Sequence, residues 1–192
     1  MTDESVSEIL LKDPIVWVDL EMTGLEPDSD VIIEIAVIVT DGALDTVAEG
    51  PDLVIHATDE ELSRMPPVVV EMHRASGLTE VVRTSQIDVR SAEQEALAFI
   101  KRHVPLVRSA PLAGNSIGTD RAFLRKHMPE LEAYLHYRNV DVSTLKELVG
   151  RWYPGLLDER GEKQGGHRAM ADIRESINEL RWYREKVFRP AG

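Results

Sequence analysis

The sequence predicts a single α/β domain, and three observations support this prediction. Short apolar runs of strand length alternate with amphipathic stretches of helix length along the 192 residues. No internal repeat and no linker-like segment divides the chain. The length suits one domain with a sizeable core. We therefore expect one domain over residues 1–192, with residues 1–13 and 189–192 as flexible tails.

Three strands are expected in the N-terminal part of the chain. Residues 15–18 form an apolar run of β-branched and aromatic residues, residues 31–40 are strongly apolar, and residues 52–56 give a plausible third strand. Asp41 and Gly42 make a hairpin-type turn between the second and third strands. Because the connections are short, an antiparallel meander is the simplest arrangement.

The middle of the chain changes character. Residues 57–90 predict only short helical turns, because prolines and polar residues are frequent there. Ser91 and Gln94 have the spacing of a capping box and open an amphipathic helix that Pro105 ends. The remaining predicted elements are a strand within residues 107–113, a helix starting at Asp120, a short strand at residues 139–142, a helix capped by Ser143 or Thr144, and a long helix over residues 168–188.

Composition restricts the class of protein. No apolar run approaches the ~20 residues that span a bilayer, and the acidic N-terminus shows no secretory signal, so no membrane partner is expected. The chain has no cysteine, which excludes thiolate metal sites and agrees with a cytoplasmic location. The net charge is −12, and basic residues occur in short, separated groups. A nucleic-acid partner would therefore be a short piece rather than a long track.

Two carboxylates follow the first predicted strand. Asp19 and Glu21 are two residues apart, so in extended chain their side chains point to the same side. Two anions this close repel each other unless a cation lies between them. Hard divalent ions such as Mg²⁺ and Mn²⁺ prefer carboxylate oxygens. The pair therefore indicates a metal site, although solvated acids at a strand end would show the same pattern. Glu34, inside the second strand, is interpreted as a structural acid.

Further candidates lie where later helices begin. Asp120 follows a strand-to-helix turn, and His167 and Asp172 flank the start of the last helix. Five residues at about 100° each separate His167 and Asp172 by roughly 140° on a helix. Both can reach one site only if His167 lies on the loop before the helix and Asp172 in its first turn or two. This arrangement gives Asp172 the role of a fixed ligand and His167 that of a movable base.

Together these acids predict a two-metal centre. Four carboxylates on rigid elements would bind two Mg²⁺ or Mn²⁺ ions about 3.5–4 Å apart, which is the arrangement for in-line phosphoryl displacement. A histidine has an ordinary pKa near 6.5 and is suited to removing a proton from the attacking water at neutral pH. The expected reaction is hydrolysis of a phosphodiester.

Three motifs in this order resemble those of the DEDDh 3′→5′ exonucleases. They are Asp19-x-Glu21, the motif from Asn115 to Asp120 and the motif from His167 to Asp172. Six longer stretches are similar to the oligoribonuclease family within that superfamily: residues 18–25, 32–41, 73–78, 112–124, 137–148 and 167–177.

This resemblance implies an RNase H-like exonuclease fold with a mixed five-stranded sheet flanked by helices. It also implies a homodimer that trims very short RNAs, above all dinucleotides, to 5′-mononucleotides. By the same resemblance Asp19, Glu21, Asp120 and Asp172 hold the two metal ions, and His167 is the general base. Leu25 would separate the two bases, His73, Ser116, Arg138 and Ser143 would surround the 5′ phosphate, and Tyr137 would come from the partner subunit.

Alternatives stay open at this point. A proofreading or RNA-maturation exonuclease acting on longer single strands would carry the same acids. A non-catalytic receptor for linear dinucleotides would share the pocket without turnover. Taken singly, Leu25 also fits loop packing, Arg138 a surface charge and Tyr137 a core position.

Overall fold

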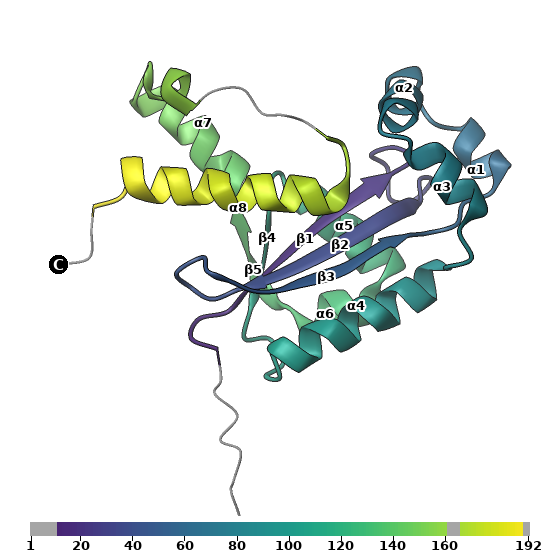
Figure 1. Ribbon diagram of the computed structural model, residues 1–192, viewed down its shortest axis with the longest axis horizontal. Helices are drawn as coiled ribbons and strands as arrows, with labels where there is room; N and C mark the ends of the chain where they lie inside the picture. The colour runs from purple at the N-terminus through teal and green to yellow at the C-terminus, as the bar shows by residue number, and fades with distance from the viewer. Residues whose placement is uncertain (1–10, 161–165, 190–192) are drawn as a thin grey trace, which may run out of the picture.

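A computed structural model describes residues 11–160 and 166–189 of the chain, and its centre is a five-stranded sheet (Figure 1). The strands are β1 (Ile15–Met22), β2 (Ile32–Thr40), β3 (Thr46–Val54), β4 (Pro111–Gly114) and β5 (His136–Asp141). The helices are α1 (Asp59–Ser63), α2 (Pro67–Ala75), α3 (Leu78–Thr84), α4 (Val89–His103), α5 (Gly118–His127), α6 (Pro129–Tyr134), α7 (Val142–Trp152), the 3₁₀ helix η1 (Leu156–Arg160) and α8 (Ala169–Lys186).

The sheet is mixed, with the strand order β3-β2-β1-β4-β5. The first three strands pair antiparallel, so the predicted meander is confirmed. Strands β4 and β5 then add in parallel on the other side of β1. The predicted fold class, an α/β fold with a mixed sheet flanked by helices, is confirmed as well.

The alternation of side chains along β1 divides the core into two layers. Val16, Val18 and Leu20 pack in the cluster that includes α4, α5 and α6, whereas Trp17 packs in the cluster beneath α7 and α8. Because Asp19 and Glu21 have the same parity as Trp17, they face the α8 side of the sheet. The first strand therefore directs its two acids toward the helix that carries Asp172.

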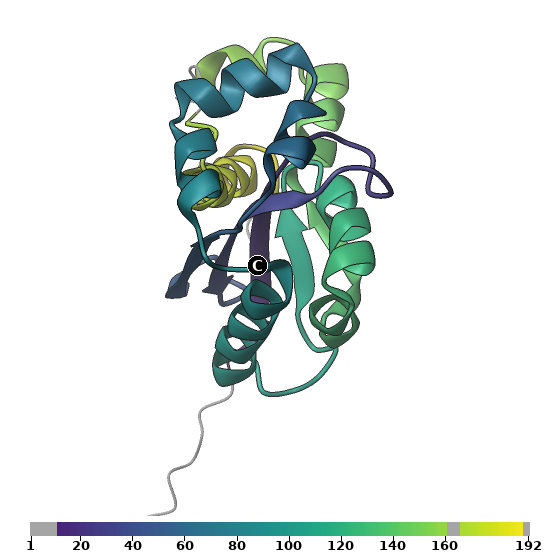
Figure 2. The same cartoon turned by 90° about the vertical axis from the view of Figure 1, so that its right-hand side faces the viewer.

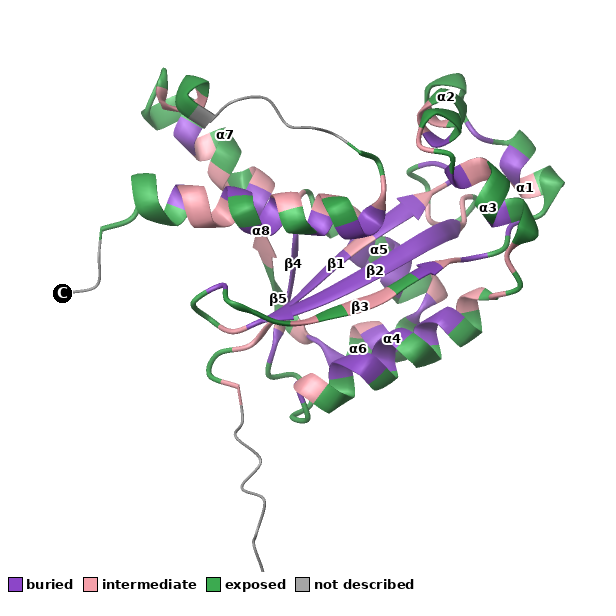
Figure 3. Cartoon of the chain, in the orientation of Figure 1, coloured by how far each residue is buried: buried purple, intermediate pink, exposed green. Residues whose placement is uncertain are grey.

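The helices cover both faces of the sheet. In Figure 1, α7 and α8 lie on one face, and α4 and α6 lie on the other. Figure 2, in which α8 is seen nearly along its axis, shows the strands between these two layers. Figure 3 shows that the central strands β1 and β2 are mostly buried while the helices present exposed outer faces. The short helices α1 to α3 form a third cluster at one end of the sheet, packed around Ile33 and Leu78.

Several element boundaries differ from the prediction. Strand β1 continues to Met22, so its two acids lie within the strand, because pairing with β2 extends past Glu21 opposite Glu34 to Met22 opposite Ile32. Strand β3 begins at Thr46, six residues earlier than predicted. Its outer half is polar because it is an edge strand, and apolar patterning does not reveal such a segment.

The predicted helix caps were wrong in two places. Helix α4 begins at Val89, and its cap is Asp88, whose carboxylate accepts a hydrogen bond from the Ser91 backbone N–H. Helix α7 is capped by Asp141 instead of Ser143 or Thr144. In both cases an aspartate upstream satisfies the first turn, and the downstream hydroxyl residues already lie inside the helix.

Residues 57–90 contain three short helices, α1 to α3, in agreement with the predicted helical turns. Residues 1–10 and 190–192 of the predicted tails, and residues 161–165 of the loop before the last helix, lie outside the described residues. The domain boundaries therefore stay a prediction. Among the described residues, no helix has the length and apolar character needed to cross a membrane.

Candidate active site

The five predicted catalytic side chains line one open cleft of about 380 Å³. Asp19 and Glu21 come from β1, and Asp120 comes from the first turn of α5. Asp172 lies in the first turn of α8, and His167 precedes that helix. The structure thus brings together residues from three distant parts of the chain. The placement of His167 on the loop and of Asp172 in the first turn agrees with the prediction from their spacing.

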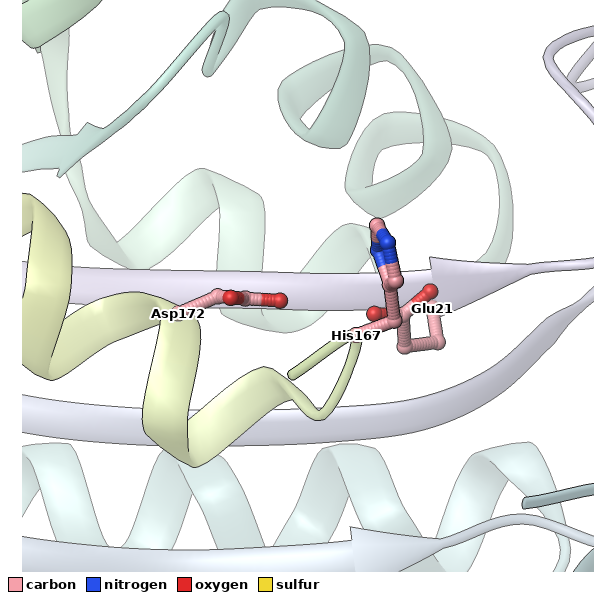
Figure 4. A group of neighbouring side chains, drawn as sticks. All are labelled: Glu21, His167 and Asp172. Atoms are coloured by element: carbon pink, nitrogen blue, oxygen red, sulfur yellow. The ribbon is translucent and has the colours of Figure 1, made fainter. Parts of the chain in front are cut away.

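Three of these side chains form a tight cluster. Glu21, His167 and Asp172 each offer one ligand atom, and these atoms lie within 4.8 Å of one another. Figure 4 shows His167 beside Glu21, with the Asp172 carboxylate directed toward them from the first turn of α8. His167 has a backbone φ of 45°, in the left-handed region. This conformation turns the chain sharply just before α8, so the imidazole lies over the cleft.

Asp120 is fixed by the strand that carries the other acids. Its Oδ1 accepts a hydrogen bond of 3.1 Å from the backbone N–H of Leu20, the residue between Asp19 and Glu21. This contact joins the start of α5 to the C-terminal half of β1. The carboxylates therefore lie on regular elements whose relative position is set by backbone contacts.

Burial and mutual repulsion dominate the electrostatics of the cleft. Burial raises the pKa of Glu21 to about 8, and the charges of Asp172, Glu34 and Asp120 add to this effect, while Arg168 opposes it. Burial also raises the pKa of Asp120 to about 7. The pKa of Asp19 is raised well above its ordinary value by burial and then by the charge of Asp120. Bound cations would reverse these shifts by favouring the charged carboxylates.

The residues present fit divalent metal ions. Oxygen ligands at neighbouring positions, held on a strand and two helix starts, suit Mg²⁺ or Mn²⁺. The repulsion among the buried acids is the structural observation that calls for positive charge at this point.

The predicted substrate residues divide into three groups. Leu25 and Ser116 line the cleft, and Leu25 is 73% exposed in the connection between β1 and β2. Its exposure argues against the loop-packing interpretation. Ser143 lies beside Ser116, with its hydroxyl 2.9 Å from the Ser116 backbone N–H and 3.1 Å from the Ser116 hydroxyl.

Two of the predicted residues lie away from this cleft. Tyr137 and Arg138 are exposed on β5, the edge strand, and the Arg138 guanidinium lies 5.6 Å from the centre of the Tyr137 ring. Tyr137 is 74% exposed, so the alternative of a core position does not hold. Neither residue lines the cleft of its own chain.

His73 is placed behind the cleft. It is fully buried on α2, and its Nε2 donates a 2.9 Å hydrogen bond to the carbonyl oxygen of Met22. Its Nδ1 lies 3.8 Å from a Glu21 carboxylate oxygen and has no hydrogen-bond partner within residues 11–160 and 166–189. This position supports the end of β1. A contact to a 5′ phosphate stays a prediction.

Sequence reasoning missed a polar network beside the site. Asn115 accepts a hydrogen bond from the Ser143 hydroxyl at 3.1 Å and donates one to the Ser176 hydroxyl at 2.7 Å. Ser176 in turn donates to the backbone carbonyl of Asp172. The network joins the end of β4 to the helix that carries Asp172. The asparagine of the second motif was the available signal, but its partners on α7 and α8 lie too far away in sequence to be inferred.

Comparison with known proteins defines the class. Residues 16–180 match the family model described as "Exonuclease". The fold is also that of the zinc-bound complex of E. coli exonuclease I with single-stranded DNA, with a TM-score of 0.70. That structure is 15% identical over 92% of this chain and 41% of the other chain, so the likeness extends to the fold alone. Fold and cleft together therefore define an exonuclease of the RNase H-like type.

Closer relatives identify the family. The chain is 54% identical to an oligoribonuclease of Rhodococcus jostii (strain RHA1) over 94% of this chain and 90% of the relative. It is 55% identical to an oligoribonuclease of Pseudomonas syringae pv. tomato over 93% of this chain and 98% of the relative. The chain belongs to the oligoribonuclease family of exonucleases, which confirms the resemblance seen in its motifs.

Proposed function

We propose that this exonuclease hydrolyses very short RNA, chiefly dinucleotides, from the 3′ end to 5′-mononucleotides. The observation that supports the reaction is the meeting of four carboxylates and one histidine in a single cleft. Relatives more than half identical to the chain are named oligoribonuclease, which supports a short RNA as the substrate. A non-catalytic dinucleotide receptor would have no use for the complete set of acids and the histidine.

Asp19, Glu21, Asp120 and Asp172 would hold two divalent ions, Mg²⁺ or Mn²⁺. When bound, such ions make water more acidic and stabilise negative charge on phosphate oxygens. The carboxylates contribute by keeping fixed positions. Two of them lie on one strand, Asp120 is bonded to that strand, and Asp172 lies in a helical first turn.

His167 would act as the general base. Its side chain is exposed at the edge of the cleft, where it can exchange protons with solvent. A ring nitrogen takes one proton from the water that attacks the phosphodiester, and the imidazolium later releases that proton to bulk water.

Substrate length would be set by groups around the 5′ phosphate. Ser116 and Ser143 offer two neighbouring hydroxyls at one end of the cleft. Arg138 carries the guanidinium needed for bidentate recognition of phosphate. Leu25, exposed at the cleft, would separate the two bases. Where these donors enclose the terminal phosphate of a bound substrate, a longer strand would collide with them, so a dinucleotide would be the preferred length.

We further propose a homodimer in which Tyr137 reaches the partner's cleft. The support is its position on the edge strand β5, its exposure, and the fact that it does not line the cleft of its own chain. A contact in the partner's cleft would also explain why a side chain as large as that of Tyr137 is exposed instead of packed in the core. A cytoplasmic location stays a prediction from the sequence.

The test is a time course with 5′-phosphorylated RNAs of two to ten nucleotides in the presence of Mn²⁺. We expect the dinucleotide to disappear fastest, and Asp120→Ala to abolish turnover while the protein stays folded by circular dichroism. Equal or faster decay of the longer RNAs would overturn the length preference and favour an exonuclease for longer strands. Retained activity of Asp120→Ala would overturn the metal-ligand assignment.

A further inference from the structure

Helix α8 begins with a backbone that its own side chains do not cap. Arg168 occupies the cap position and makes no side-chain hydrogen bond to the first turn. His167 directly before it has the left-handed φ of 45°, which is unfavourable for a residue with a side chain. Contacts from outside α8 must therefore stabilise the conformation of His167 and Arg168.

Glu34 on β2 supplies the missing contacts. One oxygen of the Glu34 carboxylate accepts a 2.8 Å hydrogen bond from Nε of Arg168. The same oxygen lies 2.6 Å from a terminal guanidinium nitrogen of Arg168. The other oxygen accepts a 3.0 Å bond from the backbone N–H of Ala169, the first residue of α8. The carboxylate thus caps the helix from another part of the chain and holds the arginine at the same time.

The sheet register explains why this acid is available. Glu34 lies opposite Glu21 in the β1–β2 pair, on the α8 side of the sheet. Its side chain is fully buried, and it is not among the residues that line the cleft. A fully buried carboxylate is costly unless it is paired and hydrogen-bonded. Here the pairing partners are the two residues that follow His167.

We propose that Glu34 is a positioning residue for His167, acting through Arg168 and the first N–H of α8. The carboxylate fixes the two residues after His167 and thereby keeps the imidazole over the cleft. This inference rests on the proposed role of His167 as general base. Glu34 does not line the cleft, so its effect on His167 is one of geometry. Its charge also acts on Glu21, and the second variant below separates this influence from geometry.

The chain contains a matched control for this contact. Glu49 on β3 forms a second ion pair with α8, through Arg174, at 2.6 Å. That pair also joins the sheet to α8, but it lies further along the helix and is largely exposed. Glu49→Gln therefore removes a sheet–helix ion pair without touching the residues next to His167.

The first experiment compares Glu34→Gln and Glu49→Gln on a dinucleotide at saturating Mn²⁺. We expect Glu34→Gln to lower kcat by about 10- to 100-fold with KM within about twofold, because a misplaced base slows the chemical step and leaves binding intact. Glu49→Gln should leave both constants within about twofold. Equal behaviour of the two variants would overturn the inference.

A second variant separates geometry from charge. Glu34→Gln removes a negative charge that also acts on Glu21, whereas Arg168→Lys keeps both charges and loses the planar fork. We expect Arg168→Lys to lower kcat in the same direction and to fold even where Glu34→Gln does not. Mn²⁺ binding, measured by titration calorimetry, should change less than about fivefold in Arg168→Lys, since no ligand is altered. Wild-type kcat in Arg168→Lys would overturn the inference.

The decisive readout is a double-mutant cycle with His167→Ala. If Glu34 acts by placing the imidazole, Glu34→Gln will cause no further loss of kcat once the imidazole is absent. The same loss in both backgrounds would mean that Glu34 acts on something else and would overturn the inference.

A measurement independent of activity completes the test. We expect amide hydrogen exchange over the first turn of α8 to accelerate in Glu34→Gln and to stay unchanged there in Glu49→Gln. Unchanged exchange in both variants would contradict the inference. Failure of the wild-type protein to release mononucleotides from a dinucleotide would instead refute the proposed function, so the two failures are distinguishable.

Discussion

At the scale of single residues, the site is a set of acids whose charges the metal-free protein tolerates poorly. Glu21 and Asp120 are 7% and 6% exposed, and Asp19 lines the same cleft, near enough for both charges to act on it. Arg168 is near enough to lower the pKa of Glu21, but Glu34 already occupies its guanidinium. The cleft is therefore preorganised for cations at some cost to the stability of the metal-free chain.

The raised pKa values predict how the metal-free protein responds to pH. An acid whose pKa is raised in the folded state stabilises the fold below its unfolded pKa, and this contribution is lost as pH rises toward the folded value. With folded pKa values of about 8 for Glu21 and about 7 for Asp120, the loss runs from about pH 4 to pH 8. We expect the EDTA-treated protein to melt several degrees lower at pH 8.5 than at pH 6, as measured by differential scanning calorimetry.

Mn²⁺ should therefore raise the melting temperature more at pH 8.5 than at pH 6, because binding at lower pH must displace protons. Asp120→Asn serves as the control and should reduce the pH dependence of the metal-free protein. A melting temperature of the EDTA-treated protein that rises from pH 6 to pH 8.5 would contradict this electrostatic account.

At the scale of elements, regular geometry delivers each functional group. Alternation along β1 sends Asp19 and Glu21 to one side, and the first turns of α5 and α8 bring Asp120 and Asp172 to the same place. The capping residue fixes where a helix starts, so a wrongly predicted cap shifts the predicted start of the helix by several residues. The structure places the cap of α4 at Asp88 instead of in the predicted box at Ser91.

This correction can be tested by two alanine substitutions. Asp88→Ala should destabilise the protein by about 0.5–2 kcal/mol, because the Ser91 backbone N–H loses its acceptor. Gln94→Ala, which removes the second residue of the predicted capping box, should change the free energy of unfolding by less than about 0.5 kcal/mol. Urea denaturation measures both changes. A larger destabilisation by Gln94→Ala than by Asp88→Ala would favour the predicted capping box over the cap at Asp88.

At the scale of the whole molecule, net charge and assembly determine which substrates fit. A net charge of −12 opposes binding of a long polyanion except where a site supplies its own cations and donors. Basic side chains such as Arg138 lie on the edge strand β5, outside the cleft of their own chain. Whether such side chains can contact a substrate therefore depends on how the subunits assemble.

Salt dependence should distinguish a short substrate from a long one. For a 5′-phosphorylated dinucleotide bound through one or two phosphate contacts, log K against log salt should fall with a slope of about −0.7 to −1.4. Binding is measured by titration calorimetry on His167→Ala at fixed Mn²⁺, because the low residual turnover of this variant leaves most of the substrate uncleaved during the titration. A markedly steeper slope for both the dinucleotide and a heptamer, together with tighter binding of the heptamer than of the dinucleotide, would favour the exonuclease for longer strands.

Subunit complementation tests whether Tyr137 acts across a dimer. Asp120→Ala and Tyr137→Ala homodimers should each be nearly inactive on a dinucleotide. In a mixed dimer, the cleft of the Tyr137→Ala subunit keeps its acids and receives Tyr137 from the partner, so co-expressed, doubly tagged heterodimers should recover up to half of the wild-type activity. No recovery would place Tyr137 in the site of its own chain, and a monomer by light scattering would refute the assembly.

The main secondary-structure elements and the connections between neighbouring strands could be predicted from the sequence. Apolar runs predicted β1 and β2, short connections predicted the meander, and residue types predicted acids at helix starts. The five catalytic candidates follow from the same local patterns, since a spacing of two on a strand or five across a helix start has direct geometric meaning. The polar outer half of β3 and the caps of α4 and α7 could not be read in this way, because polar residues fit several local structures.

The sequence by itself determined the fold class and the meander, and it predicted the acids as metal ligands, because these inferences depend on side-chain type and near neighbours. Only the tertiary structure decided that Glu34 caps α8, that Asn115 bridges two helices, and that His73 lies buried behind Glu21. Each of these contacts joins residues that are far apart in the chain. A contact of this kind has no local signature, since it exists only when packing of the sheet and helices brings the two partners together.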